Sequence, residues 1–213
     1  MGPWPADAPA LAALQEWLTR LEVAQPRWHP EEPNRLLVAG VFVAGPRGVS
    51  GAGAAGDPGW ASAVVLQEGS VVDAAVLSGR LGAPYEPGLL ALREGPLLER
   101  TVRALAVRPD VLLVDATGRD HPRGAGLATH LGWVLELPTI GVTDRALVDP
   151  SRSEPTRAQP GARPVLVHPA WRTDGPTAVA VVRSQLRVRT PAPLREARRR
   201  ARDARSRETP PEA

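Results

Sequence analysis

One stretch of the chain, residues 111–142, decides the fold; it reads VLLVDATGRDHPRGAGLATHLGWVLELPTIGV. Val111 to Val114 is a short, wholly apolar run, which is typical of a buried parallel strand, and Asp115 stands at its carboxyl end. A helical pattern from about Gly124 to Leu135 follows, and then a second short strand pattern, Thr139 to Val142. Strand, helix and strand in this order predict an open α/β sheet, whose active sites lie at the carboxyl ends of the strands.

The residues before this stretch predict three further strands and two helices. Arg35 to Ala44, Trp60 to Glu68 and Ser70 to Ser78 are apolar runs with glycines between them, and we expect them to form an antiparallel meander. Ala8 to Val23 and Pro87 to Val107 place leucines at helical spacing, and a proline ends each pattern. The resulting element order is that of a ribonuclease H-like α/β fold, a mixed sheet flanked by helices in a single domain.

The residues after 142 give a weaker pattern. Residues 144–163 are rich in Pro, Ser, Arg and Gly and predict a loop, and Pro164 to Val167 predicts one more strand. The arginine-rich residues 194–207 predict a helix that either binds phosphates or is an ordinary solvated surface. We therefore divide the chain into an N-terminal helix (1–30), an α/β body (31–192) and an arginine-rich helix with a disordered tail (193–213).

Composition limits the chemistry that this chain can carry. A length of 213 residues fits one domain, and the absence of cysteine leaves only oxygen and imidazole ligands for a metal, which favours Mg²⁺ or Mn²⁺. No apolar run is long enough to span a membrane and no signal-peptide pattern is present, so we expect a cytoplasmic protein. The net charge is only +3, and every basic residue is arginine, which indicates a coding bias and carries no function by itself.

Two carboxylates stand where a metal could be bound. Asp115 follows the predicted strand, and Glu94 lies in the first turns of the helix before it. Carboxylates from a strand end and a neighbouring helix can hold Mg²⁺ ions that polarise a phosphodiester and activate water. The same residues have a plain structural interpretation, since a strand-end Asp commonly caps a turn and a helix Glu commonly faces solvent.

The residues around these carboxylates form three ordered motifs. PYEPGLLALREGPLL covers residues 84–98, VDATGRDHPRGAGLATHLG covers residues 114–132, and LPTIGV covers residues 137–142. In order and separation these motifs resemble those of the endonuclease V family. VAGVFV near residue 40 and PVLVHPAWR near residue 168 occupy the places of the family's first strand and of a late histidine motif, so the resemblance extends over most of residues 8–200.

The resemblance implies a Mg²⁺-dependent nuclease of nucleic acid repair or turnover. Endonucleases of this family recognise deoxyinosine in DNA or inosine in RNA and hydrolyse a phosphodiester on the 3′ side of the lesion. Glu94 and Asp115 match metal ligands, and residues 84–87 match the wedge that separates bases beside the lesion while the damaged base enters a pocket. The nucleic-acid-binding residues implied in this way are Pro84, Tyr85, Pro87, Gly88, His121, Arg123 and Gly126. His121 and Arg123 have an equally good structural interpretation at the start of a helix.

Three positions depart from the family pattern. Phe42, the only phenylalanine of the chain, stands where the first strand normally carries a metal-binding aspartate. Asp144 stands where a lysine normally follows the PTIGV motif, with Arg145 one place later. Trp171 stands at the place of the late histidine, although His168 lies three residues earlier. An apolar ring in place of a carboxylate removes charge and coordination together, so we expect weaker metal binding.

These departures leave three hypotheses. The first is a nuclease that still hydrolyses inosine-containing strands with Glu94, Asp115 and Asp144 as a rearranged metal set. The second, which we place slightly higher, is a monomeric protein that binds DNA or RNA but has weakened or lost hydrolysis. The third is an interaction module whose partner is another protein.

Overall fold

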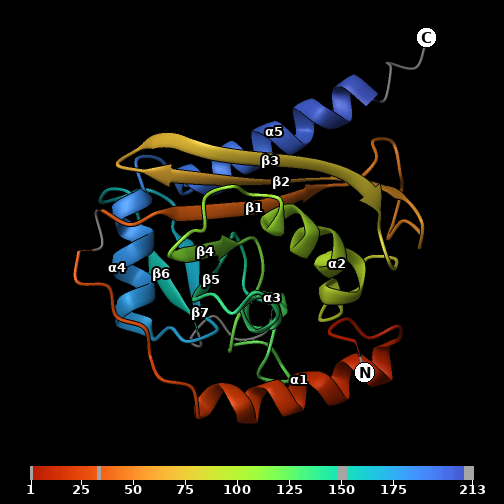
Figure 1. Ribbon diagram of the computed structural model, residues 1–213, viewed down its shortest axis with the longest axis horizontal. Helices are drawn as coiled ribbons and strands as arrows, with labels where there is room; N and C mark the ends of the chain where they lie inside the picture. The colour runs from red at the N-terminus through yellow and green to blue at the C-terminus, as the bar shows by residue number, and fades with distance from the viewer. Residues whose placement is uncertain (1, 33–34, 148–152, 209–213) are drawn as a thin grey trace.

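The computed structural model describes residues 2–32, 35–147 and 153–208, which form one mixed seven-stranded sheet with helices on both faces (Figure 1). The strand order is β3-β2-β1-β4-β5-β7-β6. The strands are β1 (Val38–Ala44), β2 (Pro58–Gln67), β3 (Ser70–Arg80), β4 (Val111–Val114), β5 (Thr139–Thr143), β6 (Glu154–Thr156) and β7 (Val165–Pro169). Strands β1 to β3 form the predicted antiparallel meander, and β1, β4 and β5 run parallel to one another. The α/β fold predicted from the sequence is confirmed.

Three helices cover one face of the sheet and two cover the other. Helices α2 (Leu90–Arg103) and α3 (Leu127–Leu135) pack on the first face, with α1 (Ala8–Val23) outside them (Figure 1). Helices α4 (Gly175–Gln185) and α5 (Ala192–Glu208) pack on the opposite face. The residues of β4 alternate between the two cores, because successive side chains of a strand point to opposite faces. The described residues contain no helix long and apolar enough to cross a membrane.

Helix α5 packs closely against β1 and β2, although its sequence is dominated by arginine. Small buried residues, Ala197, Ala201 and Ala204, form its inner side, so the helix backbone can approach the sheet. The closest approach is at Gly40 of β1, where a Cβ atom would collide with the backbone of Pro193. One side of this arginine-rich helix is therefore part of the protein core, and its arginines project from the other sides of the helix.

The structure corrects the sequence-based assignment at two places. Strand β6 lies inside residues 144–163, which we predicted to be loop, and it pairs with β7 at the sheet edge. Helix α4 was not predicted, although Asp174 caps its amino end by accepting a hydrogen bond from the backbone N–H of Thr177, and a proline stands in its first turn. The predicted disordered tail beyond residue 208 lies outside the described residues.

The N-terminal segment is held on the α2–α3 layer by aromatic and polar contacts. The Trp4 ring lies on Gly95 of α2 and stacks on the ring of His130 at 4.2 Å between centroids, and its Nε1 donates to Glu99. His130 is fully buried, and its Nε2 donates to the carbonyl oxygen of Pro3. Burial lowers the pKa of His130 to about 4, because a charged ring there would lose its hydration.

We expect Gly40→Ala to destabilise the protein, because the added methyl group would push α5 away from β1. Overpacking of this kind costs about 1–3 kcal/mol. Urea unfolding measures the change, with Gly175→Ala as the control, since a Cβ at that first residue of α4 has a single neighbour at 4.0 Å. Equal stability of the two variants would show that the α5–β1 packing is looser than described.

We expect the contribution of His130 to stability to fall as the pH falls from about 6.5 towards 4. The unfolded chain takes up protons at histidine near pH 6.5, whereas His130 in the folded state does not until about pH 4. This contribution should decrease by roughly 1 kcal/mol per pH unit in this window. It is measured as the difference in unfolding free energy between the native chain and His130→Asn, because His121 acts in the same direction and Glu94 in the opposite one in both proteins. A difference that does not change with pH would contradict the assignment.

Candidate functional site

The candidate site lies at the edge of the sheet where β1, β4 and β5 end. Val41 of β1 pairs with Val114 of β4, so Phe42 and Asp115 are the next neighbours along these two strands. Glu94 reaches the same place from α2, and the three residues line a cavity of about 220 Å³. The structure thus brings together the two predicted metal ligands and Phe42, the residue that stands in place of the family's first-strand aspartate.

Glu94 lies in a poorly hydrated position. Burial raises the pKa of Glu94 to about 8, and the nearby negative charge of Asp115 adds to this, while Arg93 acts in the opposite direction. No hydrogen bond to its carboxyl group is present in the described part of the chain. The carboxyl group is therefore largely protonated at neutral pH unless a cation binds beside it.

Asp115 is paired with a residue that the sequence analysis did not single out. The Nη2 of Arg198, from α5, donates to Oδ2 of Asp115 at 2.9 Å, and about a quarter of the Asp115 side chain remains exposed. Burial raises the pKa of Asp115, and Arg198 opposes this through its charge and its hydrogen bond. The negative charge of Asp115 is thus balanced by a protein cation.

Phe42 supports this ion pair. Its ring packs against the α5 side of the sheet near Ala197 and Ala201, and the guanidinium carbons of Arg198 and Arg202 both lie 5.6 Å from its centroid. At this distance a cation is attracted to the face of an aromatic ring. The residue that stands in place of the expected carboxylate therefore binds positively charged side chains of the protein.

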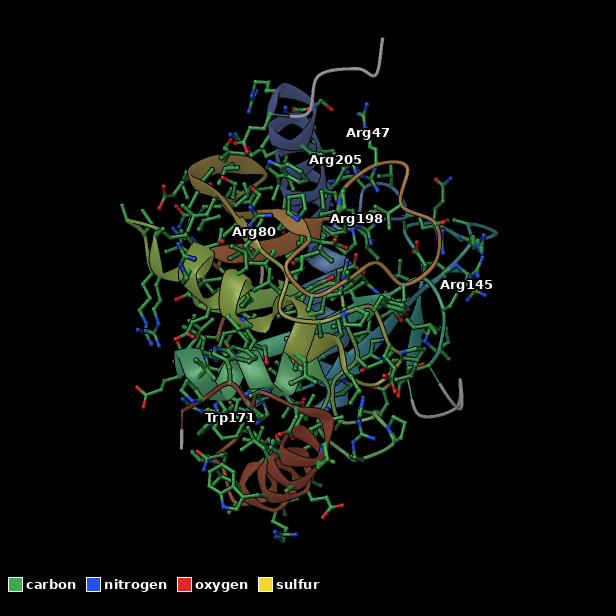
Figure 2. The ribbon with its side chains drawn as sticks, turned by 90° about the vertical axis from the view of Figure 1, so that its right-hand side faces the viewer. Arg47, Arg80, Arg145, Trp171, Arg198 and Arg205 are labelled. Atoms are coloured by element: carbon green, nitrogen blue, oxygen red, sulfur yellow. The ribbon has the colours of Figure 1, made fainter. Side chains whose placement is uncertain are left out.

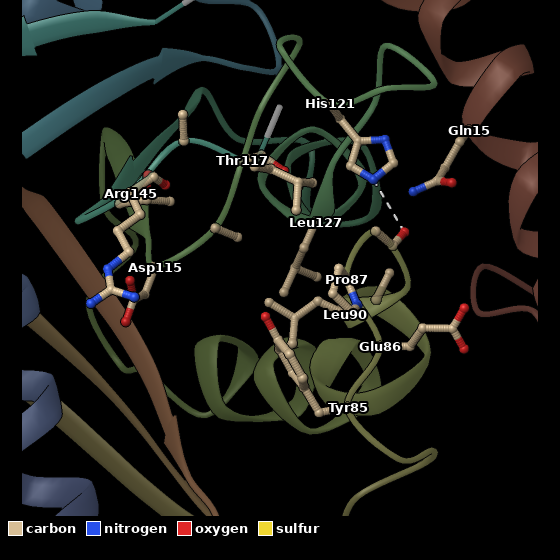
Figure 3. Close-up of a pocket in the computed structure, with 16 residues that line it drawn as sticks. Gln15, Tyr85, Glu86, Pro87, Leu90, Asp115, Thr117, His121, Leu127 and Arg145 are labelled. Carbon is tan, nitrogen blue, oxygen red and sulfur yellow. Dashed lines mark hydrogen bonds between the residues drawn. The ribbon is translucent and has the colours of Figure 1, made fainter. Parts of the chain in front are cut away.

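A larger cavity of about 360 Å³ adjoins the first and meets it at Tyr85, Leu90, Asp115 and Leu127. Three residues of the predicted wedge, Tyr85, Glu86 and Pro87, line one side of the cavity, with Thr117 and His121 opposite them (Figure 3). Gly88 and Ala116 complete this part of the lining. About half of the Tyr85 side chain is exposed at the rim. The cavity is thus open, partly apolar and bordered by a projecting aromatic ring.

His121 and Arg123 hold the wedge in place. The Nε2 of His121 and the Nη2 of Arg123 both donate to the carbonyl oxygen of Gly88, which has a positive φ of 83°. Burial lowers the pKa of His121 to about 4, and the charge of Arg123 adds to this. Gly126 is the N-cap residue of α3 and lies against Thr117, where a Cβ would collide. Of the predicted nucleic-acid-binding residues, Pro84, Arg123 and Gly126 do not line the cavity, and Arg123 supports its wall through the Gly88 carbonyl.

The loop after β5 presents Arg145 to the larger cavity (Figure 3), whereas Asp144 does not line it and pairs with Arg189 at 3.0 Å. The negative charge of Asp144 still acts on Asp115 and helps to raise its pKa. A partly buried chain of contacts holds this loop. Nδ1 of His168 lies 2.8 Å from Oδ2 of Asp120, and Nε2 lies 2.7 Å from the hydroxyl oxygen of Thr143, which also contacts the carbonyl oxygen of Arg145. A positive charge is therefore present at the cavity one position later than the family pattern has it.

Trp171 lies away from both cavities. It is buried against Leu18 and Ala125, between α1 and the start of α3. The Trp171 position therefore contributes to packing of the N-terminal helix.

The residues at the site do not fit the metal that the resemblance implies. Mg²⁺ and Mn²⁺ require several oxygen ligands in near-octahedral geometry. Within residues 2–32, 35–147 and 153–208 there is no group of three or more carboxylate or histidine side chains arranged to hold an ion. Glu94 and Asp115 are the only acidic side chains lining the smaller cavity, and Asp115 is already paired with Arg198.

Arg198 and Asp120 were not predicted as parts of the site, and Arg145 and His168 were noted only beside the departures at 144 and 171. Arg198 lies in a run of arginines in which no single residue stands out. The one available signal was the spacing of the alanines at 197, 201 and 204, which indicates the side of α5 that faces the sheet. Asp120 precedes His121 within the second motif and has no feature of its own that marks it as the partner of His168.

We expect the Asp120–His168 pair to be important for stability. Both side chains are almost completely buried, so removing one leaves the other without its polar partner, which costs about 1–3 kcal/mol. Unfolding of Asp120→Ala, His168→Ala and the double variant forms a double-mutant cycle. The double variant should lose much less than the sum of the two single variants; additive losses would contradict the pairing.

Comparison with known proteins gives matches to one family. Residues 29–189 match the family model described as Endonuclease V. The chain is 40% identical to an endonuclease V of Methanopyrus kandleri over 157 residues, 63% of this chain and 68% of that protein. It is 32% identical to an endonuclease V of Roseiflexus castenholzii over 217 residues, 92% of each chain.

Two solved structures have the same fold. The crystal structure of endonuclease V from Streptomyces avermitilis superimposes with a TM-score of 0.81 and 31% identity, covering 97% of this chain and 96% of that one. Endonuclease V from Ciona intestinalis, in complex with a 24-mer DNA containing an inosine followed by a ribo-adenosine, has a TM-score of 0.76 at 18% identity, covering 94% and 98%. Together with the matched family model, the motifs around Glu94 and Asp115 lead to one conclusion: this chain belongs to the endonuclease V family.

Proposed function

We propose that this protein binds inosine-containing strands of DNA or RNA, and that metal-dependent hydrolysis 3′ to the lesion is weakened or lost. The observation that carries the proposal is a contrast within one site. The larger cavity is lined by most of the predicted wedge, whereas the smaller cavity has a phenylalanine where the cleavage chemistry needs a carboxylate, and its Asp115 is paired with Arg198.

The larger cavity supports recognition of an extruded base. Its volume of about 360 Å³ falls in the range of roughly 300–1,000 Å³ typical of small-ligand sites. Tyr85 can stack on the base that stays in the strand, while Thr117 and the nearby backbone offer polar groups to the edge of the extruded base. Hypoxanthine is the base that the family membership makes the best candidate, since the Ciona intestinalis relative was solved with inosine-containing DNA.

Arginines around the site support binding of the sugar–phosphate backbone. Figure 2 shows Arg205 and Arg47 beyond Arg198 towards the C-terminal end of α5, and Arg145, which lines the larger cavity, to one side of them. Burial lowers the pKa of Arg205, and the charges of Arg47 and Arg202 add to this, so the three cations lie close together. A phosphate chain that passes over them would relieve the mutual repulsion, and binding should weaken as salt is added.

The loss of hydrolysis follows from the charge at the sheet edge. Family members are expected to hold Mg²⁺ or Mn²⁺ there, which would polarise the scissile phosphate and activate water. In this chain Phe42 supplies no ligand, Asp144 pairs with Arg189, and Asp115 pairs with Arg198. The rearranged ligand set of Glu94, Asp115 and Asp144 is therefore not favoured by the geometry.

Fluorescence anisotropy with inosine-containing oligonucleotides and matched inosine-free controls, in DNA and RNA forms, tests the binding. We expect tighter binding to the inosine-containing strand, and about 5- to 100-fold weaker binding for Tyr85→Ala, since one stacked base contributes about 1–3 kcal/mol. Val72→Ala, on the exposed edge strand β3, is the control and should bind normally. Equal affinity for both oligonucleotides would contradict the proposed recognition.

Strand cleavage is measured on the same labelled oligonucleotides with Mg²⁺ and Mn²⁺. We expect little or no product from the native chain. Efficient cleavage 3′ to inosine that disappears in Asp115→Ala would instead establish a working nuclease and overturn the proposed loss of hydrolysis.

A further inference from the structure

The cation bound to Asp115 is a side chain of the protein itself. The guanidinium group of Arg198 contacts Asp115 and also lies over the ring of Phe42, beside the carboxyl ends of β1 and β4. We infer that Arg198 is a built-in substitute for the metal: from the α5 side its guanidinium neutralises the Asp115 carboxylate that a divalent cation would need, and so opposes binding of an ion in the cavity that Asp115 lines together with Glu94.

The backbone fixes Arg198 at this position. Helix α5 crosses β1 at Gly40, and the alanines at 197, 201 and 204 keep its inner side against the sheet. Arg198 follows the first of these alanines, so it projects at the border of the packed side, close to Asp115. Its Nη1 lies 3.5 Å from the hydroxyl oxygen of Thr190, just before the helix, which is a weak additional contact. The chain therefore holds the Arg198 cation beside Asp115, and its effective concentration there is higher than that of a divalent ion in solution.

Phe42 and Arg198 depend on each other. A carboxylate at position 42 would share the edge with Asp115 and Glu94 and would attract a divalent ion, whereas a phenyl ring supplies no ligand and holds a guanidinium by a cation–π contact. Arg202, one turn later on α5, lies at the same 5.6 Å from the ring and adds a second positive charge. A metal at this edge would meet one free carboxyl group and two guanidinium groups, so both ligand number and charge oppose it.

This arrangement predicts that restoring the missing carboxylate alone is insufficient. In Phe42→Asp, Arg198 can pair with both Asp115 and the new carboxylate and so continues to exclude the ion. The pair of substitutions Phe42→Asp and Arg198→Met removes the competing charge and keeps most of the hydrophobic stem of the side chain. Phe42→Asp with Arg198→Lys keeps the charge and is the matched control.

The test is Mn²⁺ binding to the purified full chain, followed by electron paramagnetic resonance of the free ion. This readout needs neither nucleic acid nor activity, so it is independent of the proposed function. We expect no specific binding by the native chain, and binding by the Phe42→Asp, Arg198→Met variant at least about tenfold tighter than by Phe42→Asp alone or with Arg198→Lys. Circular dichroism confirms that each variant is folded, and Arg199→Ala with Phe42→Asp controls for loss of any arginine from α5, since Arg199 pairs only with Glu196 and Asp203 of its own helix.

Two results would overturn the inference. Specific Mn²⁺ binding by the native chain would show that Arg198 does not exclude the ion. Equal binding by Phe42→Asp with and without Arg198→Met would show that the missing carboxylate is the whole cause and that Arg198 is not a substitute cation. If the Arg198→Met pair fails to fold, Phe42→Asp with Arg198→Gln makes the same comparison with a neutral polar side chain.

Discussion

The site depends on the packing of α5 across β1. The two elements meet without side chains between them at Gly40, and the small inner side of α5 lets the helix lie flat on the sheet. This packing brings Arg198 to Asp115 and places the arginines of the helix along the opening of the site. A helix of mostly charged residues can pack against the core in this way because only every third or fourth residue of a helix has to be buried.

The candidate site consists of two adjoining cavities. The larger one, which we propose binds the base, is bordered by Tyr85, and His121 and Arg123 fix its wall through the Gly88 carbonyl. At the smaller one the charges differ from those that a metal site needs, because Arg198 of the protein pairs with Asp115, while Arg145 lies at the larger cavity.

Much of the fold could be predicted from the sequence, because strands β1 to β5 and helices α1 to α3 have clear periodic patterns between glycines and prolines. Strand β6 has three residues and pairs only at the sheet edge, so its sequence has no periodic pattern. Helix α4 did have a start signal, the capping Asp174 followed by a proline, but this signal was not used to predict it. Glu94 and Asp115 were predicted as neighbours from their places in a helix and at a strand end, and Phe42 was placed beside them through the family resemblance. The Arg198–Asp115 pair joins residues 83 positions apart, and its partner could not be chosen among many arginines without the position of α5.

The most direct test of this account is a crystal structure of the native protein soaked in Mn²⁺, with anomalous diffraction recorded to locate the ion. The account predicts that Arg198 remains hydrogen-bonded to Asp115 and that no anomalous peak appears between Asp115 and Glu94. A manganese ion bridging these two carboxylates, with the Arg198 side chain displaced into solvent, would contradict it.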